Sequence, residues 1–247
     1  MRIALLSDVH ANLEALAACL EHTRSLGVGQ RVYLGDLVGY GADPGPVVEI
    51  VEEGIRRGDV AVLGNHDAAV SRGISDRMSL DAQIVVEWTR AHLTDSQLAL
   101  LAALPFACEQ GGRLYVHANA WAPDEWEYVL TPFDAGRSMR ASPWGLTFCG
   151  HVHTPALYHM GSDGRVAAFD PVPGVAIPLG PQRRWLTIPG SAGQPRDGNP
   201  AACYAVFDDA TRRLTCFRVP YDHETAARKI AAAGLPQALD TRLVNGA

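Results

Sequence analysis

A short apolar run at residues 60–63 stops abruptly at the sequence Gly64-Asn65-His66-Asp67. The run has the length and composition of a buried β-strand. In open α/β sheets ligands bind at the carboxyl ends of the strands, so polar residues that follow such a strand lie where a site would form. Gly64 permits a sharp turn, Asn65 offers an amide oxygen, and His66 can exchange a proton near neutral pH. A single turn of this kind is also typical of an ordinary surface loop.

Four more strand-like runs end in the same way. The polar residues at their ends are Asp8 and His10, then Asp36, then His117, and finally His151 and His153. Together with His66, these turns contain five of the nine histidines of the chain. Each residue alone could be a solvated loop residue. Five strands that deliver such residues to one edge of a sheet instead indicate a metal centre.

The candidate ligands combine carboxylate, amide and imidazole groups without a thiolate. They are Asp8, His10, Asp36, Asn65, His117, His151 and His153. Such a set suits Mn, Fe, Co, Ni or Zn. Seven ligands exceed the shell of a single ion, so we expect two divalent ions, manganese first among the candidates, with Asp36 bridging them. Their net positive charge would attract a phosphate and would lower the pKa of bound water.

Apolar runs of strand length alternate with helical patterns in the first third of the chain. A helix is expected over about 12–26, a strand over 31–34, and a second helix that begins at Pro44 with Asp43 as its cap. This alternation indicates a parallel α/β layer. Later runs at 156–160, 165–169, 184–188, 203–207 and 214–219 are separated by turns rich in Gly and Pro, which predicts a second, mostly antiparallel sheet. The sequence Thr131-Pro132-Phe133-Asp134 is expected to begin a short helix, and Asp222 to cap a last helix that ends near residue 233.

Residues 71–105 interrupt the alternation. Helices are expected over about 79–91 and 95–103, and Thr94 with Gln97 forms a capping box for the second. We expect this helical insertion to cover a site or to form a partner surface, which could support a homo-oligomer. No linker divides residues 1–247, so we expect one domain.

Composition excludes several classes of protein. Hydrophobic residues make up 47% of the chain and charged residues 19%, which is typical of a globular protein. No apolar run approaches the roughly 18 residues of a membrane span. The five cysteines form no CxxC pair and the first residues do not read as a signal peptide, so a cytoplasmic location is expected.

The net charge is −6 and only one basic residue is a lysine, Lys229. Long nucleic acid is therefore a poor partner, whereas a small phosphorylated ligand is compatible.

The motifs together resemble the calcineurin-like metallophosphoesterase superfamily. The matching pieces are Asp8-Val9-His10, Gly35-Asp36, Gly64-Asn65-His66-Asp67, His117 and Gly150-His151-Val152-His153. The small bacterial and archaeal phosphoesterases of this superfamily are the most similar branch, because a late Pro189-Gly190-Ser191 turn followed by Arg196 matches theirs. Ile188 departs from the Asn that the family more often has. The resemblance implies an α/β fold, a four-layer α-β-β-α sandwich of two mixed β-sheets flanked by helices.

The resemblance also implies roles. One ion would be held by Asp8, His10, Asp36 and His153, and the other by Asp36, Asn65, His117 and His151. His66 would face the substrate and protonate the leaving oxygen or stabilise the phosphoryl group. Apart from the resemblance, Arg196 could bind the substrate phosphate or form a surface ion pair. The implied enzyme is a dinuclear metal-dependent phosphoesterase. It would hydrolyse small phosphodiesters or phosphomonoesters by attack of a dimetal-bound hydroxide on phosphorus.

Gly39 and Tyr40 depart from the pattern of protein Ser/Thr phosphatases, which have an acidic residue followed by Arg there. The departure argues against a phosphoprotein phosphatase, and it leaves His66 without an assigned carboxylate partner, since the adjacent Asp67 would point away.

Two alternatives stay open, a nucleotide phosphodiesterase or nuclease and a non-catalytic scaffold such as the related retromer subunit. Trp121, Trp126 and Tyr128 could stack on a base or aryl ester, or simply pack a loop. Arg72 and Arg77 are weaker candidates for substrate contacts.

Overall fold

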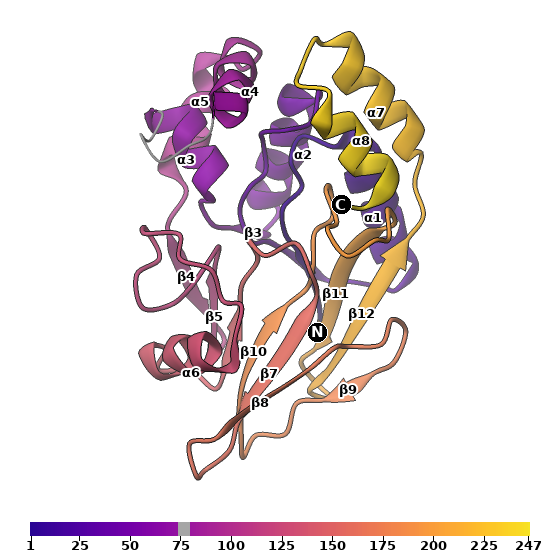
Figure 1. Ribbon diagram of the computed structural model, residues 1–247. Coiled ribbons are helices and arrows are strands. Elements are labelled where there is room, and N and C mark those ends of the chain that lie inside the picture. The colour runs from indigo at the N-terminus through magenta and orange to yellow at the C-terminus, as the bar shows by residue number, and fades with distance from the viewer. Residues whose placement is uncertain (74–79) are drawn as a thin grey trace.

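Two mixed β-sheets face each other in the computed structural model, which describes residues 1–73 and 80–247 (Figure 1). The first sheet has the order β3-β2-β1-β11-β12-β9. Its strands are β1 (Arg2–Leu6), β2 (Gln30–Tyr33), β3 (Val60–Ala61), β9 (Ile177–Pro178), β11 (Ala202–Asp208) and β12 (Arg213–Val219). The strands β1, β2 and β3 run parallel, and β11 joins β1 in the antiparallel direction.

The second sheet has the order β4-β5-β6-β10-β7-β8. Its strands are β4 (Ala107–Gln110), β5 (Arg113–Val116), β6 (Leu146–Phe148), β7 (Ala156–Met160), β8 (Val166–Phe169) and β10 (Arg184–Ile188). The central strands β5, β6 and β10 are parallel, and antiparallel strands flank them on both sides. Both sheets are therefore mixed, as the resemblance implied.

The described helices are α1 (Leu13–Ser25), α2 (Pro44–Arg56), α3 (Asn65–Arg72), α4 (Leu80–Ala91), α5 (Asp95–Ala103), α6 (Pro132–Ala141), α7 (His223–Ala232) and α8 (Ala238–Asn245). Among them, α1 and α2 pack on the first sheet, α6 packs on the second, and the others pack mainly on helices. Figure 1 shows α3, α4 and α5 at the same end of the molecule as α7 and α8. Among residues 1–73 and 80–247, none of these helices is long and apolar enough to cross a membrane.

The period-two alternation of strand side chains separates the layers. In β1, Ile3 and Leu5 belong to the apolar cluster between the sheets, where they join Tyr115 and Phe148 from the second sheet. The alternate residues Ala4 and Leu6 belong to the cluster beneath the helices α1 and α2. A third cluster fills the space between the second sheet and α6. The four-layer α-β-β-α sandwich is thus confirmed.

The capping signals at Thr94 and Thr131 are confirmed. The Thr94 hydroxyl accepts a hydrogen bond from the backbone N–H of Gln97, and the Gln97 side-chain oxygen accepts one from the backbone N–H of Thr94. Thr131 caps α6 in the same way through Asp134. Asp43 lies at the N-cap position and α2 begins at Pro44, as expected. The expected capping role of its side chain is wrong, because the carboxylate makes no capping hydrogen bond and instead accepts one from Lys229.

The arrangement of the later strands was also predicted wrongly. They do not form a separate, mostly antiparallel sheet, because β7, β8 and β10 join the second sheet whereas β9, β11 and β12 complete the first. The turn at residues 64–67 begins a short helix, α3, and neither β4 nor α8 was expected. The expected helix start at Ser79 and the candidate Arg77 lie outside the described residues.

Candidate metal centre

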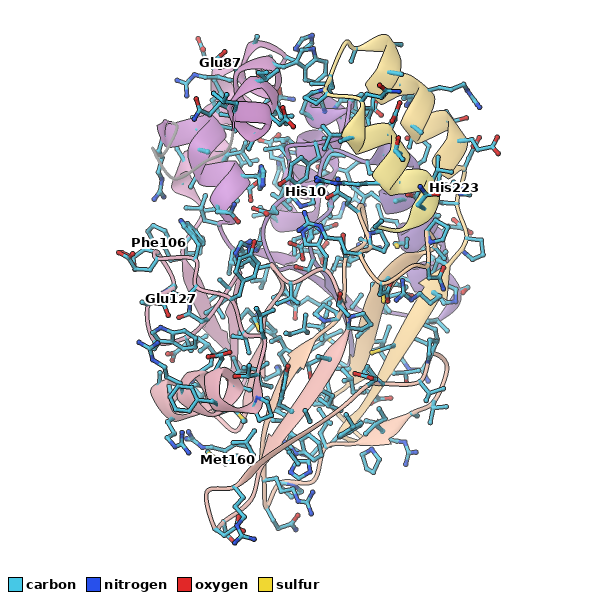
Figure 2. The ribbon with its side chains drawn as sticks, in the orientation of Figure 1. His10, Glu87, Phe106, Glu127, Met160 and His223 are labelled. Carbon is cyan, nitrogen blue, oxygen red and sulfur yellow. The ribbon has the colours of Figure 1, made fainter. Side chains whose placement is uncertain are left out.

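The carboxyl ends of strands from both sheets meet at one place, and the loops that follow them contain all seven predicted ligands. The sequence pattern predicted one sheet edge, whereas the structure forms the site from two. β1, β2 and β3 contribute Asp8, Asp36 and Asn65 from the first sheet, and β5 and β6 contribute His117 and His151 from the second. Figure 2 shows His10 in the interior of the molecule at this junction.

Five of the predicted ligands have a left-handed backbone, which is uncommon for residues other than glycine. Their φ angles are 54° at Asp8, 49° at His10, 51° at Asp36, 68° at His151 and 67° at His153. The surrounding loops hold this conformation, for example through the hydrogen bonds from the His10 backbone N–H to the Asp36 carbonyl (2.9 Å) and from Asp8 to Gly35 (3.1 Å). Such strain collects at functional sites because it directs several side chains toward one point.

Two of the groups of donor atoms among the described residues consist of predicted ligands alone. The ligand atoms of Asp8, His10 and His153 all lie within 4.8 Å of one another, and so do those of Asp36, His117 and His151. In the first group, Nε2 of His153 is 3.2 Å from Nε2 of His10 and 3.4 Å from Oδ1 of Asp8. Donor atoms that converge this closely fit a shared cation.

The second group has the same character and contains the predicted amide ligand. Nε2 of His117 lies 3.1 Å from Oδ1 of Asn65 and 3.1 Å from Nδ1 of His151. Oδ2 of Asp36 lies 3.4 Å from this nitrogen and 3.7 Å from Nε2 of His10 in the first group. Asp36 therefore stands between the groups, which fits the predicted bridging position.

Backbone carbonyls orient three of the imidazoles. Nδ1 of His10 lies 3.2 Å from the Val38 carbonyl oxygen. Nδ1 of His117 lies 2.7 Å from the Leu34 carbonyl oxygen, and Nδ1 of His153 lies 2.7 Å from that of Gln194. A proton on Nδ1 leaves Nε2 as the free lone pair, which is the arrangement that metal-binding histidines use. Gln194 was not expected from the sequence, although it lies two residues before the predicted Arg196.

Burial controls the charges of these groups. It lowers the pKa of His10 and His153 far below the usual value and the pKa of His151 to about 3, so these rings are neutral, the form that binds metals. Burial, with Asp36 nearby, raises the pKa of Asp8 to about 7. For Asp36, the surrounding histidines, His117 first, outweigh burial and lower the carboxyl pKa. The site without an ion thus concentrates buried groups that a cation would stabilise.

His66 lies beside both groups. Its backbone N–H donates to Oδ1 of Asp36 (2.9 Å), and its ring centroid is 5.1 Å from that of His10. Nδ1 of the buried ring has no hydrogen-bond partner among the described residues. Since its ligand atoms also lie within 4.8 Å of those of His10 and Asp36, the role of His66 as a non-ligand stays a prediction.

Asp67 is not the partner of His66. Its carboxylate accepts hydrogen bonds from the backbone N–H groups of Leu37 (2.9 Å), Val38 (3.1 Å) and Gly64 (3.0 Å). These contacts join the loop after β2 to the start of α3. Asp67 therefore positions the loop that contains Asp36, and the expectation that it points away from His66 agrees with its contacts.

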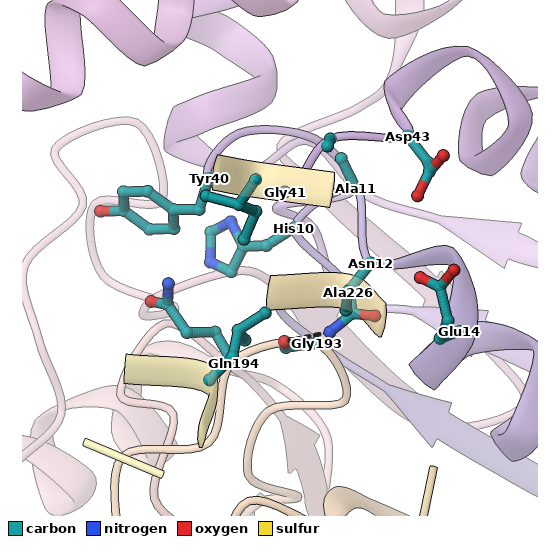
Figure 3. A pocket seen from close by; sticks show the side chains of 13 residues that line it. His10, Ala11, Asn12, Glu14, Tyr40, Gly41, Asp43, Gly193, Gln194 and Ala226 are labelled. Atoms are coloured by element: carbon teal, nitrogen blue, oxygen red, sulfur yellow. Dashed lines mark hydrogen bonds between the residues drawn. The ribbon is translucent and has the colours of Figure 1, made fainter. Parts of the chain in front are cut away.

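Tyr40 and Arg196 border the site on the side of the first group. The Tyr40 ring lies 4.4 Å from the ring of His66 and 4.6 Å from that of His10. The Arg196 guanidinium lies 5.9 Å from the Tyr40 ring and donates to the Gln194 side chain (3.0 Å). Figure 3 shows Tyr40, His10 and Gln194 together on one side of a small cavity. In the sequence, Tyr40 stood out only because it departs from the pattern of protein Ser/Thr phosphatases. No sequence pattern predicted that its ring packs on His10 and His66.

The other residues weighed as candidates lie as follows. Tyr128 stacks on His151, with ring centroids 4.0 Å apart, and Trp126 meets His117 edge to face at 5.8 Å. The ring of Trp121 packs under the guanidinium of Arg137 instead. Arg72 donates to the Ala102 carbonyl at 2.8 Å.

Comparisons with known proteins agree with this geometry. Residues 1–212 match the sequence profile of the calcineurin-like phosphoesterase superfamily domain. An uncharacterized protein of Methanocaldococcus jannaschii is 33% identical over 253 residues, which cover 99% of this chain and 98% of that protein. The crystal structure of a metallophosphoesterase from Sphaerobacter thermophilus is 36% identical and superimposes with a TM-score of 0.89, over 100% of this chain and 99% of that one.

A hypothetical protein from Pyrococcus horikoshii shares the fold at lower identity. Its crystal structure superimposes with a TM-score of 0.79 at 19% identity, over 100% of this chain and 98% of that one. These relatives are bacterial and archaeal, as the resemblance implied. The profile match over most of the chain and the full-length relatives agree, and the chain therefore belongs to the calcineurin-like phosphoesterase superfamily.

Proposed function

We propose that the protein is a metal-dependent phosphoesterase that hydrolyses small phosphodiesters or phosphomonoesters. The observation that supports this most strongly is the convergence of two groups of donor atoms on either side of Asp36. Two divalent ions bound there, with manganese the first to test, would supply the nucleophile from water and neutralise charge on the phosphoryl group. The neutral ligands Asn65, His10 and His153 would keep the centre positive enough to attract a phosphate.

The chain's own residues would orient and bind the ester. Burial lowers the pKa of His66, so the ring is neutral and can donate one N–H to a phosphoryl or leaving-group oxygen. Arg196 would supply a fixed positive charge beside Tyr40. The assignment of His66 agrees with the role that the resemblance implied.

A small substrate is more compatible with the charge of the protein than a polymer is. The net charge of −6 disfavours long nucleic acid. All five cysteines are free, which suits a reducing compartment such as the cytoplasm. A purely structural role, the scaffold alternative, would not need seven polar side chains gathered around one buried carboxylate.

The test is hydrolysis of bis-p-nitrophenyl phosphate and p-nitrophenyl phosphate by purified protein with added Mn²⁺, with elemental analysis of bound metal. We expect activity, and we expect Asp36→Ala to lose activity and at least half of the bound metal. His159→Ala is the control, because His159 lies on β7 in contact with Arg183, away from the site. Full activity in Asp36→Ala would overturn the proposal, and bound metal without hydrolysis of any ester would favour the scaffold.

A further inference from the structure

A groove of about 650 Å³ opens beside the second group of predicted ligands. Its volume lies in the range of small-molecule sites. Asn65 and His151 form its inner end, and the other residues that matter here are Ala68, Arg72, Phe106, Trp126 and Tyr128. The small side chains of α3 leave the space open, and aromatic rings form much of the remaining wall.

Tyr128 presents an aromatic face to this groove. One face of its ring stacks on His151, with centroids 4.0 Å apart and an interplanar angle of 16°. The residue is nevertheless 47% exposed, so the opposite face is accessible. A flat group bound there would extend a stack that begins at a predicted metal ligand.

The other aromatic residues of the groove are held in place. Trp126 has a φ of 59°, which is strained for a bulky residue. Its backbone forms a hydrogen bond with the His151 side chain, and its ring meets His117 edge to face. Phe106 lies 5.7 Å from the Trp126 ring, and the Arg72 guanidinium lies 4.9 Å above Phe106. Figure 2 shows Phe106 at the edge of the molecule below α3.

We propose that this groove binds a planar aromatic group of the phosphate ester, a nucleobase or an aryl ring, while the phosphorus lies at the predicted metal centre. The inference rests on the proposed function and narrows its substrate class. Asp124 and Glu125 also line the groove, and their charges disfavour a second phosphate beyond the aromatic group. The expected substrate is therefore a short ester with one aromatic substituent near the phosphorus, and not a polynucleotide.

The test compares phenylphosphonate with methylphosphonate as inhibitors of bis-p-nitrophenyl phosphate hydrolysis by the Mn²⁺-loaded protein. We expect phenylphosphonate to bind at least tenfold more tightly. Tyr128→Leu and Phe106→Leu keep apolar volume but remove the flat ring, so each should reduce this preference to less than threefold and leave methylphosphonate inhibition unchanged. Phe169→Leu is the matched control, because Phe169 is a partly exposed ring on the edge strand β8, and it should keep the full preference.

Ribose 5-phosphate and adenosine 5′-phosphate, tested as inhibitors in the same assay, distinguish the two sources of the aromatic group. Tighter binding of the adenosine compound indicates a nucleobase, and a gain only with phenylphosphonate indicates an aryl ring. If phenylphosphonate inhibits no better than methylphosphonate, and adenosine 5′-phosphate no better than ribose 5-phosphate, while the protein still hydrolyses the ester, the groove assignment is wrong and the proposed function stands. Failure of methylphosphonate to bind and of the ester to be hydrolysed overturns the proposed function as well.

Discussion

His66 packs directly against the backbone of Gly39, with no room for a side chain between them. A Cβ on Gly39 would lie 2.7 Å from Nδ1 of His66, and the φ of +90° at this position already disfavours other residues. We predict that Gly39→Ala displaces the imidazole and lowers kcat at least tenfold with bis-p-nitrophenyl phosphate, because a small misplacement of a positioned group is costly. The predicted metal ligands do not contact Gly39 in this way, so bound metal should stay within a fifth of the wild-type amount.

Gly58→Ala is the matched control for Gly39→Ala. Gly58 has a similar φ of +99°, but a Cβ there would meet nothing within 4 Å. Both variants lose roughly 1–3 kcal/mol of stability to the backbone. Only Gly39→Ala should lose activity, and an equal loss in both variants would show that the steric contact with His66 is unimportant.

His66 itself allows a test of ligand against non-ligand. We predict that His66→Gln lowers kcat by about 10²–10⁴, the range that general acid–base groups contribute. Metal content should not fall, because the seven predicted ligands remain. His117→Gln is the comparison, since it removes a ring 3.1 Å from Asn65 and should lose metal and activity together. Parallel loss of metal in both variants would make His66 a ligand.

At the scale of elements, one side chain joins three helices. Nζ of Lys229 on α7 lies 2.5 Å from Oε1 of Glu14 in the first turn of α1 and 2.9 Å from Oδ2 of Asp43 at the start of α2. We predict that Lys229→Met destabilises the protein by about 1 kcal/mol, because it leaves two carboxylates close together without a cation. Urea unfolding should show the change as a lower midpoint with an unchanged slope.

Arg228→Met tests whether that loss comes from the contacts of Lys229 or from any charge removed from α7. Arg228 is the neighbouring residue, and its guanidinium lies 3.8 Å from Glu224 on the same, exposed surface of the helix. An exposed pair of this kind contributes about 0.3–0.5 kcal/mol. A larger midpoint shift in Arg228→Met than in Lys229→Met would contradict the proposed bridge.

Local signals were predictable from the sequence, and pairings between distant segments were not. The capping boxes at Thr94 and Thr131 were predictable because a cap involves residues three apart. The split of the later strands between two sheets depends on pairings such as β1 with β11, about 200 residues apart, which no local pattern encodes. The helix α3 was missed because it begins with Asn65 and His66, two polar residues of the candidate site. Polar residues there interrupt the apolar periodicity from which a helix is predicted.

The same distinction applies to the site. Each predicted ligand follows a strand, and the rule that ligand sites form at the carboxyl ends of strands predicted that these side chains lie close together. The orientation of Tyr40 and the stack of Tyr128 on His151 depend on loop conformations, including positive φ at Tyr40 and Trp126, that a sequence does not reveal. The convergence of these side chains was therefore predictable, whereas the surroundings of the site were not, and the role of these residues as metal ligands stays a prediction.

At the scale of the whole molecule, the helical insertion and the C-terminal helices form a common apolar cluster. Val85 of α4 packs with Ile230 of α7 and with Leu239 and Leu243 of α8, and Tyr40 packs against the same cluster. The cluster thus connects two peripheral parts of the chain to a ring that contacts His66. Whether this end of the molecule also forms the expected homo-oligomer stays a prediction.

The predicted metal centre joins both sheets, so its occupancy should control the stability of the whole protein. Without a cation, the sandwich encloses the carboxylates of Asp8 and Asp36 beside buried imidazoles, and burial opposes the charged form of Asp8. An ion that binds only the folded chain stabilises it by about 2.7 kcal/mol at a free concentration of about 100 times Kd. For a chain of this size, we predict that chelation lowers Tm by roughly 5–10 °C and that added Mn²⁺ restores it. Asp36→Ala, which should bind less metal, should show a smaller change in Tm in differential scanning calorimetry. A Tm that changes with neither chelator nor Mn²⁺ in the unsubstituted protein would mean that the junction of the two sheets needs no ion.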